Sequence, residues 1–127
     1  MKTAVRTEQA PAPFQGAPYS QAIRAGDFVF VSGQLALRPG STEIEADSIE
    51  EQTEQVFANL RAILEEAGSS LDRLVKTTVF LADLGDFASM NEVYARHVGA
   101  TPPARSTIEV SALPSGARVE IEAIAHL

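Results

Sequence analysis

The chain has 127 residues, of which 45% are hydrophobic and 21% are charged, a composition typical of a globular protein. It contains no cysteine, which excludes disulfides, thiolate nucleophiles and cysteine-ligated metals. The formal net charge of −7 repels phosphate backbones, so we expect no nucleic-acid partner.

The sequence also disfavours a membrane location and several kinds of catalysis. No run of eighteen apolar residues could span a bilayer, and residues 1–14 lack the apolar segment of a secretory signal, so we expect a cytoplasmic protein. His97 and His126 have no partner at metal-binding spacing, and no Asp-x-Asp-x-Asp-Gly loop is present. Glycine-rich phosphate loops and a Gly-x-Ser-x-Gly elbow are also missing. We therefore expect no metal, no nucleotide cofactor and no acyl-serine catalysis.

The first third of the chain predicts three strands. Residues 3–7 suit a short edge strand, and a proline-rich loop follows them. The apolar runs 22–25 and 28–32 are joined by a Gly-Asp pair, which indicates a hairpin. The second run begins Phe-Val-Phe-Val, so we expect it to be buried on both faces. Ser32-Gly33-Gln34 then interrupts it, which indicates a β-bulge or a place where another group approaches the backbone closely.

Two helices are predicted further along the chain. Ser48 and Glu51 have the spacing of a capping box. Apolar residues at helical spacing continue from there to Ala67. Asp86 is expected to cap a second helix, which ends at Gly99.

Three more strands complete the predicted sheet. Residues 74–81 are mostly β-branched or apolar. Residues 101–110 and 118–123 each alternate with period two, and the proline and glycine between them predict a hairpin. The resulting order is β-β-β-α-β-α-β-β. It predicts a single α+β domain, residues 1–127, with a six-stranded mixed sheet and two helices packed on one face.

Two helices can cover only one face of such a sheet. We expect apolar residues of the central strands on the uncovered face, together with Ile124. A face that mixes polar and apolar groups is typical of a subunit interface, so we expect a closed homo-oligomer. If the last two strands form a hairpin, the polar residues on this face are Arg105, Thr107, Glu109, Glu120 and Glu122.

The residues alone leave the chemistry of this face open. Arg105 follows Pro102 and Pro103, which help to fix the start of its strand. Its guanidinium suits two-pronged binding of a carboxylate. Alternatively, it pairs with Glu122 or Glu120 across the hairpin. Each of these carboxyl groups could act as a general acid/base or could simply be solvated.

Three other positions each allow a functional and a structural interpretation, whereas a fourth, His97, is interpreted as structural. Tyr19 could donate a hydrogen bond to a ligand or could anchor its loop. Ser32-Gly33 could present a backbone amide to an anion or could form a bulge. Asn91 could line a site or could lie on the helix surface. His97 suits the C-terminus of the second helix, where a partly protonated imidazole is favourable.

Six motifs follow one another along almost the whole chain: Tyr19-Ser20-Gln21-Ala22, Phe30-Val31-Ser32-Gly33-Gln34, Val75-Lys76-Thr77-Thr78-Val79-Phe80-Leu81, Asn91-Glu92-Val93-Tyr94, Pro103-Ala104-Arg105-Ser106-Thr107 and Val119-Glu120-Ile121-Glu122-Ala123-Ile124-Ala125. In this order and register they resemble the RidA (YjgF) family. Several motifs in register are far more specific than any one of them. The chain is similar to the archetypal, deaminase-competent members.

The resemblance implies a chorismate-mutase-like fold assembled as a homotrimer, with ligand clefts between subunits. It implies hydrolysis of reactive imine and enamine intermediates, such as 2-iminopropanoate and 2-iminobutanoate, to 2-oxo acids and ammonia, without a cofactor. One alternative is a non-catalytic trimer that binds small carboxylates in the same cleft. Another is a ribonuclease or chaperone activity. The acidic charge and the lack of a histidine pair disfavour a ribonuclease.

The resemblance also implies roles for individual residues. By position, Arg105 would hold the substrate carboxylate, and Glu120 would handle water and the imine nitrogen. Thr107 stands where many members have cysteine, and its hydroxyl can still hydrogen-bond a substrate. Ala17-Pro18 replaces the common Gly-Pro before the tyrosine motif. The other positions that match cleft residues are Tyr19, Ser32, Gly33 and Asn91.

Overall fold

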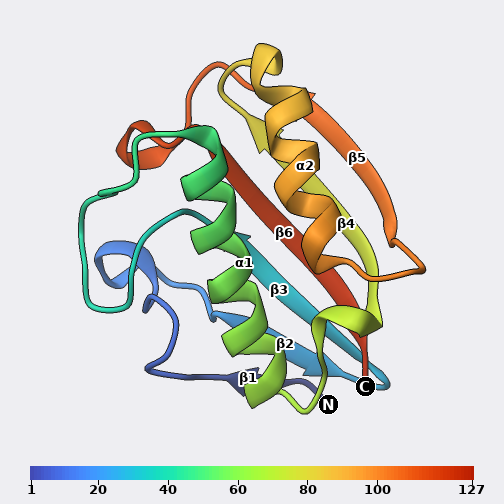
Figure 1. The fold of residues 1–127 in the computed structure, drawn as a ribbon. Coiled ribbons are helices and arrows are strands. Elements are labelled where there is room, and N and C mark those ends of the chain that lie inside the picture. Colours follow the sequence, from blue (N-terminus) through green and yellow to red (C-terminus); the bar gives the residue numbers. More distant parts are fainter.

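The computed structural model describes all 127 residues. Figure 1 shows a single sheet with both α-helices packed on the same face. The element order is the predicted one, and it confirms an α+β fold with a six-stranded mixed sheet. The elements are β1 (Thr3–Val5), β2 (Ala22–Ala25), β3 (Phe28–Gln34), α1 (Ile49–Glu66), β4 (Leu74–Leu81), α2 (Phe87–His97), β5 (Ala104–Glu109) and β6 (Val119–His126).

Helix α1 begins at the predicted capping box. The Glu51 amide donates to Ser48 Oγ at 3.0 Å, and the Ser48 hydroxyl donates to Glu51 Oε1, also at 3.0 Å. Such a cap stabilises a helix by about 1 kcal/mol. The predicted apolar stripe is fully buried, as at Val56, Leu60 and Ile63. Neither helix combines the length and the apolar composition that a membrane span requires.

The order of strands in the sheet is β1-β2-β3-β6-β4-β5. The predicted hairpin between the last two strands is therefore wrong. β5 pairs parallel with β4 at the edge of the sheet, and β6 lies antiparallel between β3 and β4. Helix α2 is the crossover that lets β4 and β5 lie side by side in parallel. β6 takes a central place because one of its faces is buried throughout, at Val119, Ile121, Ala123 and Ala125.

This pairing also reverses the face predicted for the polar residues of β5. Arg105 lies opposite the fully buried Thr77 in the β4–β5 register. Its guanidinium contacts Asn91 of α2, so it points towards the helices. Because side chains alternate along a strand, Thr107 and Glu109 point the same way. None of the three lies on the open face of the sheet.

The open face combines carboxylates with apolar side chains. Glu120 lies opposite Phe80 in the β4–β6 register, and Phe80 lies opposite Ile108 in the β4–β5 register. Ile108 therefore shares the face of Glu120 and is 47% exposed. Phe30, opposite Ile124, is 43% exposed, so the prediction that β3 is buried on both faces does not hold within one chain. Both helices pack on the other face and leave this one uncovered.

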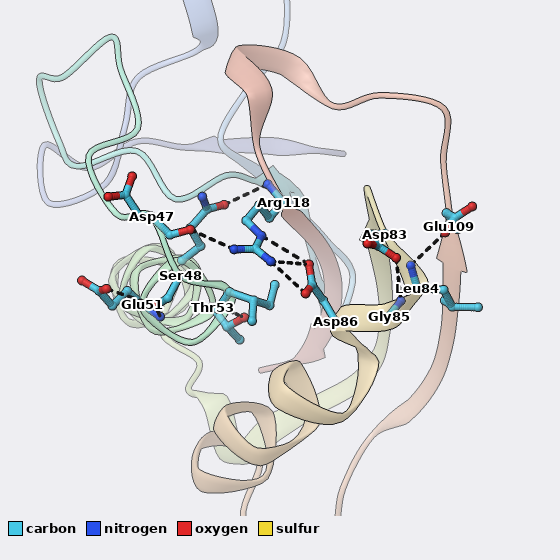
Figure 2. A network of polar contacts seen from close by, with 12 residues as sticks. Asp47, Ser48, Glu51, Thr53, Asp83, Leu84, Gly85, Asp86, Glu109 and Arg118 are labelled. Atoms are coloured by element: carbon cyan, nitrogen blue, oxygen red, sulfur yellow. Dashed lines mark hydrogen bonds and ion pairs between the residues drawn. The ribbon is translucent and has the colours of Figure 1, made fainter.

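Arg118 connects the start of β6 to the N-termini of both helices, as Figure 2 shows. Its Nη2 donates to the two carboxylate oxygens of Asp86 at 2.9 and 3.1 Å, and its Nη1 donates to the Asp47 carbonyl at 3.1 Å. Its backbone amide donates to Gln52 Oε1 at 2.9 Å. Asp86 stands at the predicted N-cap of α2, but its side chain makes no capping hydrogen bond. It binds Arg118 instead.

Candidate functional site

Arg105 is the centre of one group of candidate residues. Its Nη1 donates to Asn91 Oδ1 at 2.8 Å. Its Cζ lies 4.7 Å from the ring centroid of Tyr94 and 5.5 Å from that of Phe87. The guanidinium of an edge strand is thus held against three side chains of α2.

The positive charge of Arg105 has no carboxylate partner within the chain. The ion pairs of the chain involve other residues, so the alternative pairing with Glu122 or Glu120 is wrong. It does not form because β4 separates β5 from β6. A guanidinium has five N–H donors, and the bond to Asn91 uses one of them. Two parallel donors of a guanidinium are enough to bind a carboxylate in two-pronged fashion.

Glu120 belongs to a second group, at the bulge of β3. The register with β6 shifts between Val31 and Gln34, which confirms the predicted bulge. Glu120 lies so close to Gly33 that its Oε2 occupies the space of a β-carbon at that position, with Cδ 2.9 Å away. The group that approaches the backbone at this glycine is therefore the Glu120 carboxylate.

The environment of Glu120 favours its protonated form. Burial raises the pKa of the Glu120 carboxyl above its ordinary value, and the negative charge of Glu122 raises it further. A carboxyl group with a raised pKa holds its proton closer to neutral pH. This property suits a general acid/base.

The N-terminal loop uses the hydroxyl groups of Tyr19 and Ser32 for its own structure. The Phe14 amide donates to Tyr19 Oη at 2.6 Å, and Ser32 Oγ donates to the Ser20 carbonyl at 2.6 Å. Tyr19 nevertheless remains 44% exposed. It lines a surface cavity of about 900 Å³ that includes no other predicted site residue. Within one chain, Tyr19 is a loop anchor set apart from Arg105.

Thr107 has a buried hydroxyl without a hydrogen-bond partner. It lies opposite Val79 in the β4–β5 register, on the same face of β5 as Arg105. An unpartnered buried polar atom is uncommon and calls for a specific explanation.

The sheet divides the predicted site residues into two groups. Arg105, Asn91 and Thr107 lie on the helix-covered side. Glu120 contacts Gly33 on the open side. The guanidinium of Arg105 and the carboxyl group with the raised pKa thus lie on opposite sides of the sheet of one chain.

The sequence did not predict that Tyr94 would pack against the guanidinium of Arg105, or that Thr77 would hold Tyr94 in place. Tyr94 Oη and Thr77 Oγ1 lie 2.6 Å apart, and both residues are buried. Helical periodicity correctly placed Tyr94 in the apolar stripe of α2. Its contact with Arg105 follows from the parallel pairing of β4 with β5, which the sequence pattern did not indicate.

These features define a class: α+β domains with an arginine guanidinium that has no ion-pair partner on one side of a sheet and a carboxyl group with a raised pKa on the other. The structure contains no group of three or more His, Asp or Glu side chains that could hold a metal ion. A family model described as endoribonuclease L-PSP matches residues 7–127. The chain belongs to this family, which is also the family of RidA and YjgF.

Relatives of the chain match over almost its full length. A RutC family protein of Pyrococcus abyssi is 52% identical over 98% of this chain and 97% of its own. Reactive Intermediate Deaminase A, chloroplastic, of Arabidopsis thaliana is 50% identical over 99% of this chain and 66% of its own. The structure of E. coli TdcF with bound serine has a TM-score of 0.90 and 40% identity, and the match covers 98% of both chains.

Proposed function

We propose that the protein hydrolyses reactive 2-imino acids and their enamine tautomers, such as 2-iminopropanoate and 2-iminobutanoate, to 2-oxo acids and ammonia. The observation that carries this function is the guanidinium of Arg105, held by α2 without a carboxylate partner. The relative named reactive intermediate deaminase supports the activity. The serine bound to E. coli TdcF supports a small ligand with a carboxylate.

In the proposed assembly, three copies form a homotrimer with a cleft at each subunit contact. Arg105, Asn91 and Thr107 of one copy face Glu120 and Gly33 of the next. Two observations support this arrangement. Within one chain the two groups lie on opposite sides of the sheet. The open face also exposes large apolar side chains, including Phe30 and Ile108, as expected of an interface.

The proposed reaction needs no nucleophile from the protein, because the carbon of a protonated imine is already electrophilic. Arg105 binds the carboxylate and orients the C=N bond. Glu120 first gives its proton to the imine nitrogen, and the resulting carboxylate accepts a proton from water as the water oxygen bonds to C2. Glu120 then delivers that proton to the nitrogen, the tetrahedral intermediate expels ammonia as its C–N bond breaks, and the remaining hydroxyl returns a proton to Glu120 to give the 2-oxo acid. An enamine enters the same path after protonation at C3.

The test generates the imine in place, with a threonine dehydratase or an amino-acid oxidase, and follows the release of 2-oxo acid. We expect the wild type to accelerate release and Arg105→Ala to abolish the acceleration. Arg105→Lys should be nearly as damaging, because an ammonium group cannot donate two parallel hydrogen bonds to a carboxylate as a planar guanidinium does. A rate equal to the spontaneous one, with 2-oxo acid binding detected by calorimetry, would identify a non-catalytic binding protein instead.

A further inference from the structure

The guanidinium of Arg105 lies over the ring of Tyr94. The distance from Cζ to the ring centroid is 4.7 Å, within the range of an attractive cation–π contact. Phe87 is the other ring near the guanidinium, at 5.5 Å. Phe87 is 39% exposed, whereas Tyr94 is only 5% exposed. Of the two rings, Tyr94 is the one that the fold holds in place.

The far end of the Tyr94 side chain is fixed by β4. Its hydroxyl shares a hydrogen bond of 2.6 Å with Thr77 Oγ1. Thr77 lies directly opposite Arg105 in the β4–β5 register. The ring also packs edge-on against Phe57, with centroids 5.4 Å apart. The Tyr94 side chain thus connects Thr77, which lies opposite Arg105 on β4, to the guanidinium of Arg105.

The Tyr94 phenol carries no negative charge that would balance the positive charge of Arg105. Burial raises the pKa of Tyr94, while the hydrogen bond to Thr77 and the charge of Arg105 act in the opposite direction and only reduce the rise. The ring is therefore neutral at physiological pH. It attracts the guanidinium through its π face without forming an ion pair with it.

We infer that Tyr94 is a positioning residue, whose ring, together with Asn91 Oδ1, holds the guanidinium plane of Arg105 ready for the carboxylate of the bound acid. This inference rests on the proposed function. It adds the residue that orients Arg105, the side chain proposed to bind the carboxylate. An arginine already held in place loses less side-chain freedom when it binds a carboxylate. Tyr94 itself does not touch the substrate.

The test measures the affinity for 2-oxobutanoate by calorimetry. Tyr94→Phe keeps the ring and should bind within about threefold of the wild type, whereas Tyr94→Leu should bind about tenfold more weakly. Val93→Ala is the matched control, because Val93 is fully buried on the same helix. It should bind like the wild type. The inference would be overturned if the Tyr94→Leu variant folds and binds 2-oxobutanoate as tightly as the wild type does.

A double-mutant cycle separates positioning from general damage to the fold. In an Arg105→Ala background, where ligand-observed NMR can follow weak binding, Tyr94→Leu should cause no further loss. The same fold-loss in both backgrounds would assign Tyr94 a structural role only. Arg105→Ala that binds like the wild type would instead contradict the site assigned under the proposed function, so the two failures are distinguishable.

Thr77 provides a second route if Tyr94→Leu does not fold. Thr77→Val removes the bond that fixes the ring and should weaken binding about threefold, the size expected for one hydrogen bond. Thr77→Ser keeps the hydroxyl and should bind like the wild type. Equal affinities of Thr77→Val and Thr77→Ser would contradict the inference.

Discussion

Glu120 places its carboxylate in the space where a side chain at position 33 would begin, so any larger residue at position 33 must displace this carboxylate. The glycine is required by a side chain from a different strand, not by its own backbone conformation, since Gly33 is not among the residues with positive φ. The bulge of β3 is the feature that exposes the backbone to this approach. Gly33 and Glu120 therefore form one unit of the proposed site.

Gly33→Ala should displace the Glu120 carboxylate while leaving the fold intact, because the end of a flexible side chain can move aside. We expect imine hydrolysis to fall by about tenfold or more, since general acid/base catalysis depends on close positioning. The in-place imine assay measures this. In a Glu120→Gln background, Gly33→Ala should not lower the rate of imine hydrolysis further. A further loss of similar size would mean that Gly33 acts independently of Glu120.

Within one chain the pKa of Glu120 is raised, which predicts a specific dependence of stability on pH. The proposed assembly brings Arg105 of a neighbouring copy to Glu120, and this guanidinium would lower the pKa, so the comparison is made between Arg105→Ala and Arg105→Ala/Glu120→Gln. In Arg105→Ala the folded state binds the Glu120 proton more tightly than the unfolded state, so the free energy of unfolding falls as pH rises from the ordinary glutamate pKa through the raised one. Adding Glu120→Gln should remove this fall and give the more stable protein at neutral pH, with the difference narrowing in acid.

Urea unfolding at fixed protein concentration across this pH range measures the effect. In the same Arg105→Ala background, Glu122→Gln is the matched control, because it removes only the smaller, electrostatic cause of the shift. It should make the fall shallower without abolishing it. Parallel pH profiles for Arg105→Ala and Arg105→Ala/Glu120→Gln would contradict the prediction.

Substitutions at Thr107 test whether its unpartnered hydroxyl hydrogen-bonds to the bound acid. Burying a hydroxyl without a partner costs about 1–3 kcal/mol, so Thr107→Val should be at least as stable as the wild type in chemical unfolding. If the bound acid supplies the partner, Thr107→Val should lose about threefold to tenfold in imine hydrolysis, the value of one hydrogen bond. Thr107→Ser should retain activity. Full activity in Thr107→Val would remove this residue from the site.

The contact between Arg118 and Asp86 predicts a stability effect far from the chemistry (Figure 2). The Asp86 side chain is only 14% exposed, so Asp86→Ala leaves a partly buried guanidinium without its carboxylate. We expect a loss of about 1–2 kcal/mol in the free energy of unfolding. Arg38→Ala breaks the exposed pair with Glu45 and should cost less than about 0.5 kcal/mol. Equal losses would show that burial does not strengthen the Arg118 contact.

The elements that depend on nearby residues were predictable from the sequence. The capping box at Ser48 and the apolar stripe of α1 are encoded within a few turns of one helix. The interruption at Gly33 correctly indicated a bulge and a close approach. Its occupant, Glu120, comes from the far end of the chain, and no local pattern could identify it.

The parts that depend on strand pairing were not predictable. Period-two alternation correctly grouped Arg105 with Thr107, but it does not say which group faces the helices. Polar residues were assigned to the open face on the usual expectation that polar side chains face away from the core. The structure places Arg105 beside Tyr94 instead, because α2 and the β4–β5 pairing offer a guanidinium an aromatic ring and an amide oxygen there.

The separation of Arg105 from Glu120 by the sheet leads to the central claim, that a complete site takes one residue from each of two copies. Alone, Arg105→Ala should be inactive and Glu120→Gln should keep only a small residual rate. When the two variants are unfolded and refolded together in equal amounts, about a quarter of the wild-type rate of imine hydrolysis should return, because each cleft draws its two halves independently. Mixed assemblies with no activity above that of the separate variants would contradict the claim.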